Sequence, residues 1–179
     1  TLWKTEKSKR TMNKALRNLH KIVSTRLAQA KRHHEAGRLG EAESLFSQIL
    51  KEFGDDPEAV LACAETAAAL GEVDAALSLY QRAERLMPNM AQILGSFGTF
   101  LARIGKSGEA IALLKRAVSL TPSDAQLHYN LGKAQASQGA TTQAVDSFRQ
   151  ASKLDPKFAW AHTNLGNALS DLGRHEEAA

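Results

Sequence analysis

Hydrophobic and polar positions in residues 125–158 follow the period of an α-helix rather than that of a strand. Leu127, Leu131 and Ala134 are three or four residues apart, as one face of a helix requires. Gly139 interrupts this pattern, and Asp155-Pro156 closes the segment, because a residue before proline disfavours helix. Between these two breaks runs a second stripe of helical spacing, formed by Ala144, Phe148, Ala151 and Leu154. The segment therefore predicts two amphipathic helices joined by a turn.

This helical pair recurs along the chain with a period of 34 residues. Three kinds of position mark the period: a turn glycine, an alanine early in the second helix, and a small residue in the first helix. They are Gly37, Gly71, Gly105, Gly139 and Gly173; Ala42, Ala76, Ala110, Ala144 and Ala178; and Ala30, Ala64, Gly98, Gly132 and Gly166. Such a repeat predicts a row of stacked helical hairpins, because one hairpin cannot bury its apolar side alone.

Turn chemistry predicts where each helix begins and ends. Gly139 is expected to end its helix in the left-handed conformation. Asp56-Pro57 is expected to start one, with aspartate as the N-cap and proline in the first turn. The second helices are expected to be capped by Asp74, by Ser107, and by Thr141 or Thr142.

The small residues predict close packing inside each hairpin. We expect Gly132 and Ala144 to let the backbones of their two helices approach. Four larger residues are expected to fill the space between hairpins: Phe46, Tyr80, Leu114 and Phe148.

These positions resemble the defining positions of the tetratricopeptide repeat family. The resemblance covers residues 23–179, as four whole units and part of a fifth: 23–56, 57–90, 91–124, 125–158 and 159–179. It implies an all-α fold, a right-handed α-solenoid of helix-turn-helix repeats. The first unit departs from the pattern at Gln29, Ile49 and Gly54. Since the chain stops at Ala179 in the middle of a predicted helix, we expect the parent protein to continue.

Residues 1–22 form a separate basic segment. They hold seven Lys or Arg and one Glu, whereas residues 23–179 hold 16 basic and 18 acidic residues. The spacing of Met12, Leu16, Leu19 and Val23 predicts a helix that leads into the first repeat. Basic residues with Trp3 among them could contact nucleic acid or an anionic membrane, and the alternative, which we favour, is a solvated basic helix or tail.

The composition argues against several other classes of protein. No run approaches the roughly 18 apolar residues of a membrane span, and Cys63 is the only cysteine, which favours a cytoplasmic location. Gly105-Lys106-Ser107 lacks the earlier glycine of a phosphate loop, since position 100 is Phe100. No catalytic group stands out, and we expect no metal, no cofactor and no small-molecule substrate. The chain itself is therefore predicted not to be an enzyme.

In the family, the concave surface is lined by set positions of the first helices. The resemblance places here a peptide-binding groove formed by Leu27, Lys31, Leu61, Glu65, Tyr129, Asn130, Lys133, Asn164 and Asn167. Asn130 and Asn164 resemble two steps of the asparagine ladder in the repeat domain of O-linked N-acetylglucosamine transferases. Asparagine holds a peptide backbone with both a donor and an acceptor. The other interpretation is that asparagine is simply common at this position.

Three functions are compatible with the sequence. The first is a non-catalytic scaffold that binds a peptide segment of a partner protein in the concave groove. The second is the substrate-recruiting arm of a larger enzyme resembling a glycosyltransferase or sulfotransferase. The third is a self-assembling module that forms oligomers through the exposed ends of the array.

Overall fold

The computed structural model describes residues 2–178, and it describes the side chains of Lys14 and of residues 17–177. These residues form ten helices and no strand. The helices are α1 (Leu2–Glu35), α2 (Leu39–Phe53), α3 (Pro57–Leu70), α4 (Val73–Leu86), α5 (Ala91–Arg103), α6 (Ser107–Leu120), α7 (Ala125–Ser137), α8 (Thr141–Leu154), α9 (Ala159–Asp171) and α10 (His175–Ala178). The predicted all-α class of helical hairpins is confirmed. The predicted repeat boundaries fall directly before α3, α5, α7 and α9.

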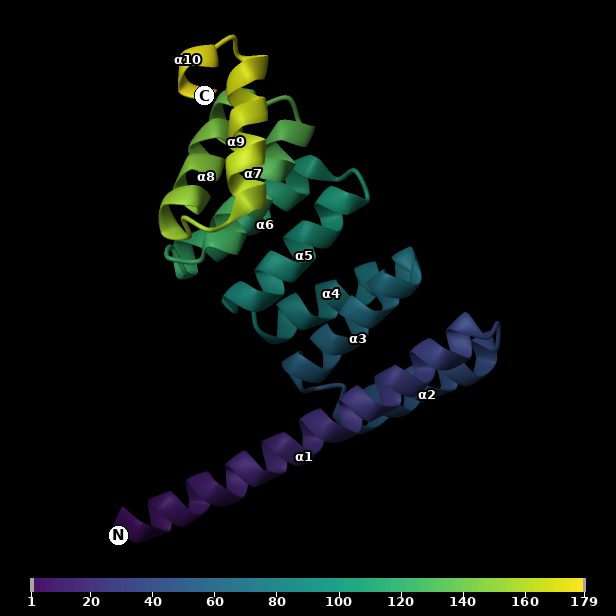
Figure 1. The fold of residues 1–179 in the computed structure, drawn as a ribbon. Coiled ribbons are helices and arrows are strands. Elements are labelled where there is room, and N and C mark those ends of the chain that lie inside the picture. The colour runs from purple at the N-terminus through teal and green to yellow at the C-terminus, as the bar shows by residue number, and fades with distance from the viewer. Residues whose placement is uncertain (1, 179) are drawn as a thin grey trace. The chain divides into compact units, whose positions relative to one another are not determined.

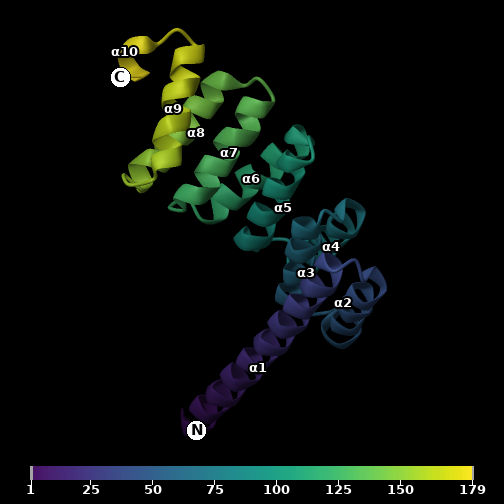
Figure 2. The same cartoon turned by 45° about the vertical axis from the view of Figure 1, so that its right-hand side comes forward.

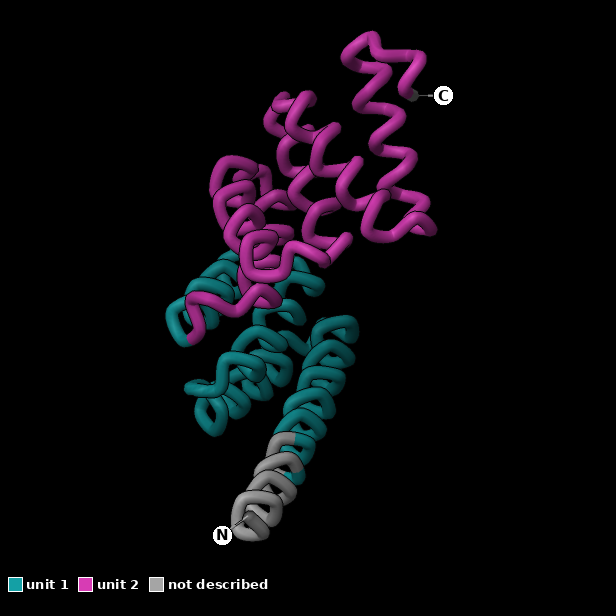
Figure 3. The backbone as a smooth tube through the Cα atoms, turned by 90° about the vertical axis from the view of Figure 1, so that its left-hand side faces the viewer, with its two compact units in different colours: residues 1–86 teal, residues 87–179 magenta. Residues whose placement is uncertain are grey.

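The chain divides into two compact units, residues 1–86 and residues 87–179 (Figure 3). In the first unit, α1 pairs with α2 and α3 pairs with α4, and α3 also contacts both α1 and α2. Its core contains Val23 and Leu27 of α1, Ile49 of α2, and Ala59 and Cys63 of α3.

The helix α1 has 34 residues and runs without a break through the predicted boundary at residues 22 and 23 (Figure 2). The side chains of Trp3, Met12 and Leu16 lie outside the described residues. Leu19 packs against the core of the first unit, as the predicted stripe requires.

In the second unit, consecutive helices pack side by side from α5 to α10 (Figure 1). One of its core clusters contains Ala144, Val145 and Phe148 of α8 together with Ala168 and Leu169 of α9. The buried polar side chains Gln135 of α7 and Ser147 of α8 are hydrogen-bonded to each other, since the serine hydroxyl donates to the glutamine Oε1 at 2.7 Å. A core hydrogen bond therefore joins the two helices of one hairpin.

Each hairpin turns at a glycine with a positive φ, as predicted for Gly139. The five φ values are 73° at Gly37, 85° at Gly71, 84° at Gly105, 81° at Gly139 and 71° at Gly173. The residue after the glycine donates its amide to a carbonyl of the preceding helix; Lys106 N, for example, lies 2.9 Å from Leu101 O. Only glycine adopts this conformation without a steric cost, which explains its period.

The predicted caps of the second helices are wrong. The N-cap of α6 is Lys106 and that of α8 is Ala140, and neither makes a side-chain capping bond. Asp74, Ser107, Thr141 and Thr142 instead lie inside the first turn of their helices. The second helix begins earlier than expected because the glycine turn and the amide bond after it already set the chain direction.

Two of the first helices, α3 and α7, are capped by side chains, as predicted for Asp56, whereas α5 and α9 start after Met90 and Phe158 without a side-chain capping bond. The Asp56 carboxylate accepts a hydrogen bond of 2.8 Å from Ala59 N, and Pro57 lies in the first turn. Asp124 caps α7 in the same way, by accepting from Gln126 N and Leu127 N.

Two histidines stabilise, by hydrogen bonds, the turns that precede their helices. His128 Nε2 lies 2.9 Å from Pro122 O, and His162 Nε2 lies 3.1 Å from Pro156 O. Since the same bond recurs one repeat later, these histidines are structural.

At Gly98 and Gly132, the small residue of the first helix makes room for a large side chain of the second helix. A Cβ atom on Gly132 would lie 2.7 Å from the Phe148 ring, and one on Gly98 would lie 2.7 Å from Leu114 Cγ and 3.2 Å from Ala110 O. A close approach to the backbone of the second helix is therefore present at Gly98, whereas at Gly132 the nearest atoms are those of the Phe148 ring, so that Phe148 and Leu114 also fill space within their own hairpins.

We expect Gly98→Val to lower the free energy of unfolding by about 2 kcal/mol, because its side chain would overpack the contact with Leu114. Gly40→Val is the matched control: no atom lies within 4 Å of its added Cβ, so the change should stay within about 0.5 kcal/mol. Urea unfolding followed by circular dichroism measures both. Equal stability of the two variants would contradict the close approach.

Candidate peptide-binding surface

Two of the first helices in the second unit are connected by a chain of polar side chains. Asn130 of α7 donates from Nδ2 to Thr99 Oγ1 of α5 at 3.0 Å. Its Oδ1 accepts from Gln126 Nε2, also at 3.0 Å. The Thr99 hydroxyl in turn donates to Gly95 O at 2.8 Å. These bonds fix the orientation of the Asn130 amide.

The next asparagine along the array is also oriented by its neighbours. Asn164 Nδ2 donates to Trp160 O at 2.8 Å and lies 3.3 Å from the hydroxyl oxygen of Tyr129. Both hydrogens of this amide group therefore have partners. No donor to Asn164 Oδ1 is found among the described residues, so this oxygen keeps its capacity to accept a hydrogen bond.

Aromatic packing holds Tyr129 in place between the helices. Its ring centroid lies 4.9 Å from that of Phe158 and 5.8 Å from that of Phe148. Lys133 Nζ lies 5.6 Å from the centroid of the Tyr129 ring, within range of a cation–π contact. The charge of this exposed lysine is thus held near the Tyr129 ring.

Trp160 is a surface residue that the predicted set of site residues omitted. Its side chain is 66% exposed, although tryptophan usually buries most of its area. It lies one helical turn before Asn164 and at the second position of its repeat, one of the positions that the family directs inward. Its position in the 34-residue repeat is the feature of the sequence that could have identified Trp160 as a site residue.

The predicted groove residues of the first unit lie in different environments. Leu27 is 7% exposed and Leu61 is 2% exposed, so both belong to the core and offer little surface to a ligand. Lys31 is exposed and pairs with Glu35, with Nζ 3.8 Å from the carboxylate oxygen. Glu65 is exposed as well, as is Asn167 in the second unit.

Metal-binding clusters and membrane-spanning helices are not found in the part of the chain that the structure describes. No cluster of three or more His, Cys, Asp or Glu side chains could hold a metal ion there. No helix among the described residues combines the length and the apolar character that crossing a membrane requires. The segment Gly105-Lys106-Ser107 forms the turn into α6, and Lys106 Nζ lies 3.3 Å from a carboxylate oxygen of Glu109.

Cys63 is completely buried in the core of the first unit. Burial removes water from the thiol, disfavours the thiolate, and raises the pKa of Cys63 from 9.0 to about 12. The residue therefore behaves as the small hydrophobic side chain that the sequence predicts.

The row of helical hairpins defines a helical-repeat scaffold of the kind that serves protein interactions. Two family models match: one described as "TPR repeat" over residues 101–139 and 136–173, and one described as "Tetratricopeptide repeat" over residues 33–95. The chain belongs to the tetratricopeptide repeat family. No curated protein sequence matches it significantly.

Solved structures of MamA proteins share this fold. MamA from Desulfovibrio magneticus RS-1, from residue 41 to the end, is 23% identical with a TM-score of 0.74, covering 88% of this chain and 89% of that chain. A structure titled MamA AMB-1 is 25% identical with a TM-score of 0.70, covering 86% of this chain and 90% of that chain.

The burial of Cys63 predicts a thiol that reacts only after unfolding. A disulfide reagent at pH 8 should leave the folded chain unmodified and should label it fully in about 6 M guanidinium, because only the exposed thiol ionises in this range. Absorbance of the released thiolate measures the reaction. Since the folded pKa is the higher one, this residue stabilises the fold fully below pH 9, and stability falls as the pH rises from 9 towards 12. Rapid labelling without denaturant would contradict the described core.

Proposed function

We propose that the chain binds an extended segment of a partner protein along the surface formed by α5, α7 and α9. The observation that carries this proposal is the pair of oriented amides, Asn130 and Asn164. Both are held by hydrogen bonds to their own repeat array, and both retain hydrogen-bonding capacity.

The remaining capacity of these amides suits the backbone of a peptide. Asn130 keeps one N–H and one lone pair of Oδ1 beyond the bonds described, and Asn164 keeps its carbonyl oxygen. A peptide backbone offers the complementary groups at every residue. Because the two side chains are already oriented, binding costs less conformational entropy than it would with freely rotating amides.

The spacing of the two asparagines supports an extended ligand. They occupy the same position in successive repeats, 34 residues apart. Packed helices are about 10 Å apart, and an extended chain advances about 3.3 Å per residue. About three ligand residues would therefore separate the two contacts, so that side chains between them are tolerated with little selection.

Exposed side chains beside the amides supply the selectivity. Trp160 offers an apolar face to a ligand side chain, and Lys133 and Asn167 are exposed on the same set of first helices. We place the peptide site on Tyr129, Asn130, Lys133, Asn164 and Asn167 together with Trp160. Leu27 and Leu61 contribute through the core, since little of their surface is available.

The two other functions considered from the sequence stay predictions. These are the substrate-recruiting arm of a larger enzyme and the self-assembling module. Contact of residues 1–22 with nucleic acid or an anionic membrane also stays a prediction, as does the cytoplasmic location.

A library of random, unstructured peptides selected on the chain tests the proposal. We expect the enriched peptides to bind at least about tenfold more weakly to Asn130→Ala/Asn164→Ala, because each lost hydrogen bond costs roughly 1 kcal/mol. Fluorescence anisotropy of labelled peptides measures the affinities.

The matched control replaces two exposed amides on second helices, in Gln81→Ala/Gln143→Ala. This variant should bind the same peptides as tightly as the native chain does. The proposal is wrong if the library yields no binder, or if both double variants bind the selected peptides equally well.

A further inference from the structure

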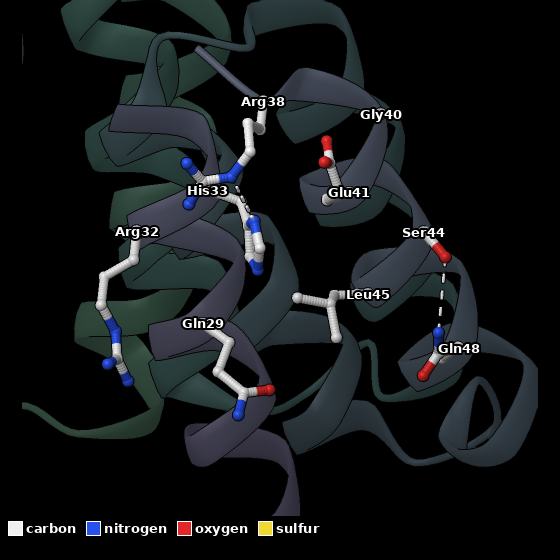
Figure 4. Close-up of a pocket in the computed structure, with 9 residues that line it drawn as sticks. All are labelled: Gln29, Arg32, His33, Arg38, Gly40, Glu41, Ser44, Leu45 and Gln48. Atoms are coloured by element: carbon white, nitrogen blue, oxygen red, sulfur yellow. Dashed lines mark hydrogen bonds between the residues drawn. The ribbon is translucent and has the colours of Figure 1, made fainter. Parts of the chain in front are cut away.

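A groove of about 790 Å³ lies between α1 and α2 of the first unit, and the proposed peptide surface does not include it. Gln29, Arg32 and His33 line its α1 side, and Ser44, Leu45 and Gln48 line its α2 side (Figure 4). Arg38, in the turn between the helices, lies near His33. The groove is therefore open, with one apolar residue among polar and basic ones.

The repeat register shows what occupies this place on another first helix. Four repeats of 34 residues separate Gln29, Arg32 and His33 from Leu165, Ala168 and Leu169 of α9. Those three α9 residues pack against Ala144, Val145 and Phe148 of α8. This face of α9 therefore receives the second helix of the preceding hairpin.

The same arrangement holds within the first unit. Cys63 of α3 corresponds to Gln29 in the register, and it is buried in one cluster with Ile49, while Phe46 of α2 packs against that cluster. Thus α2 packs on α3 as α8 packs on α9. In both cases this side of a first helix is the packing surface for another α-helix.

On α1 the corresponding packing surface is polar and basic. The residues that are apolar on α9 are replaced by an amide, a guanidinium and an imidazole. The three α1 side chains are partly or fully exposed. An ordinary apolar helix would bury these groups without partners, which costs free energy. A helix that packs on this surface must carry groups that pair with these three side chains.

Charge selects the chemistry of that helix. Arg32 and Arg38 are two full positive charges at the groove, and Glu41 is the one carboxylate that lines it. Arg38 Nε donates to His33 Nδ1 at 3.0 Å, which holds both side chains in position. A neutral His33 therefore carries its hydrogen on Nε2, as a further donor. The groove thus favours carboxylates.

Helix direction places those carboxylates. Consecutive helices joined by short loops run antiparallel, as α8 and α9 do. A helix that packs on α1 in the way that α8 packs on α9 would therefore run antiparallel to α1. Its N-terminus would then lie beside the last turn of α1, which contains Arg32 and His33. A helix N-terminus carries partial positive charge, so acidic side chains are favoured in its first turn, and there they would also lie beside the arginines.

We propose that the groove between α1 and α2 is a second docking surface, which binds an α-helix of a partner protein with acidic residues in its first turn. The apolar face of that helix rests on Leu45. Its carboxylates pair with Arg32 and Arg38. This surface is distinct from the asparagine surface in location, in the conformation of the ligand and in its charge.

A displayed library of helical peptides of roughly 18 residues tests the proposal. Each peptide carries a fixed apolar stripe, and Asp, Glu, Gln and Lys vary in its first turn. On the native chain we expect about fivefold enrichment of Asp and Glu in that turn, consistent with two partly exposed ion pairs. On Arg32→Glu/Arg38→Glu the enrichment should shift to Lys.

Three further variants make the result specific. Arg32→Gln/Arg38→Gln should lose the enrichment without the shift to Lys. Arg85→Glu/Lys153→Glu changes the net charge equally at exposed residues elsewhere, and it should keep the acidic preference, as should Asn130→Ala/Asn164→Ala. Circular dichroism confirms that each variant is folded. The proposal is overturned if the native chain shows no acidic enrichment, or if charge reversal at Arg32 and Arg38 leaves the enrichment unchanged.

Discussion

Within each unit of this chain, helices of successive hairpins bury apolar faces against each other, and the other features of the structure depend on that constraint. The face of α9 that contains Leu169 is covered by α8, and the face of α3 that contains Cys63 is covered by α2. The covering helix must arrive at a fixed distance and angle in every repeat. The glycine turns and the small residue of each first helix meet this requirement, which is why they recur with one period.

The same constraint separates residues that serve packing from residues available for binding. On α9 the side that packs against α8 is apolar, whereas Asn130 of α7 and Asn164 of α9 lie on a side with polar neighbours. On α1 the packing side itself has become polar, through Gln29, Arg32 and His33. A change of residue type at a fixed register position therefore indicates a change of neighbour.

The fold could be predicted from the sequence almost completely, because it depends on a repeated local pattern. The glycine turns, the Asp56 cap and the boundaries of the first helices all follow from chemistry within a few residues. The capping of the second helices could not be predicted in this way. Ser107 and Thr141 are good capping residues, but the turn glycine and the amide bond that follows it start these helices before them.

The candidate site was less predictable, because it depends on contacts between repeats. The register placed Asn130 and Asn164 at the same repeat position, but their bonds to Thr99 and Tyr129 connect residues more than 30 apart. Position alone also placed Leu27 and Leu61 in the groove, although an apolar side chain there turns into the core. The hydrogen bonds of His128 to Pro122 and of His162 to Pro156 became apparent only in the structure.

The buried bond between Ser147 and Gln135 has a consequence for the history of such an array. Both partners lie within the one 34-residue segment 125–158, in α7 and α8, and neither depends on a side chain from another repeat. A duplication of this segment would copy donor and acceptor together and leave no orphaned polar group in the new core. A recombination crossover within the segment would separate the donor Ser147 from the acceptor Gln135. Polar residues in the core of a repeat protein are therefore inherited most safely when the unit of duplication is the whole hairpin.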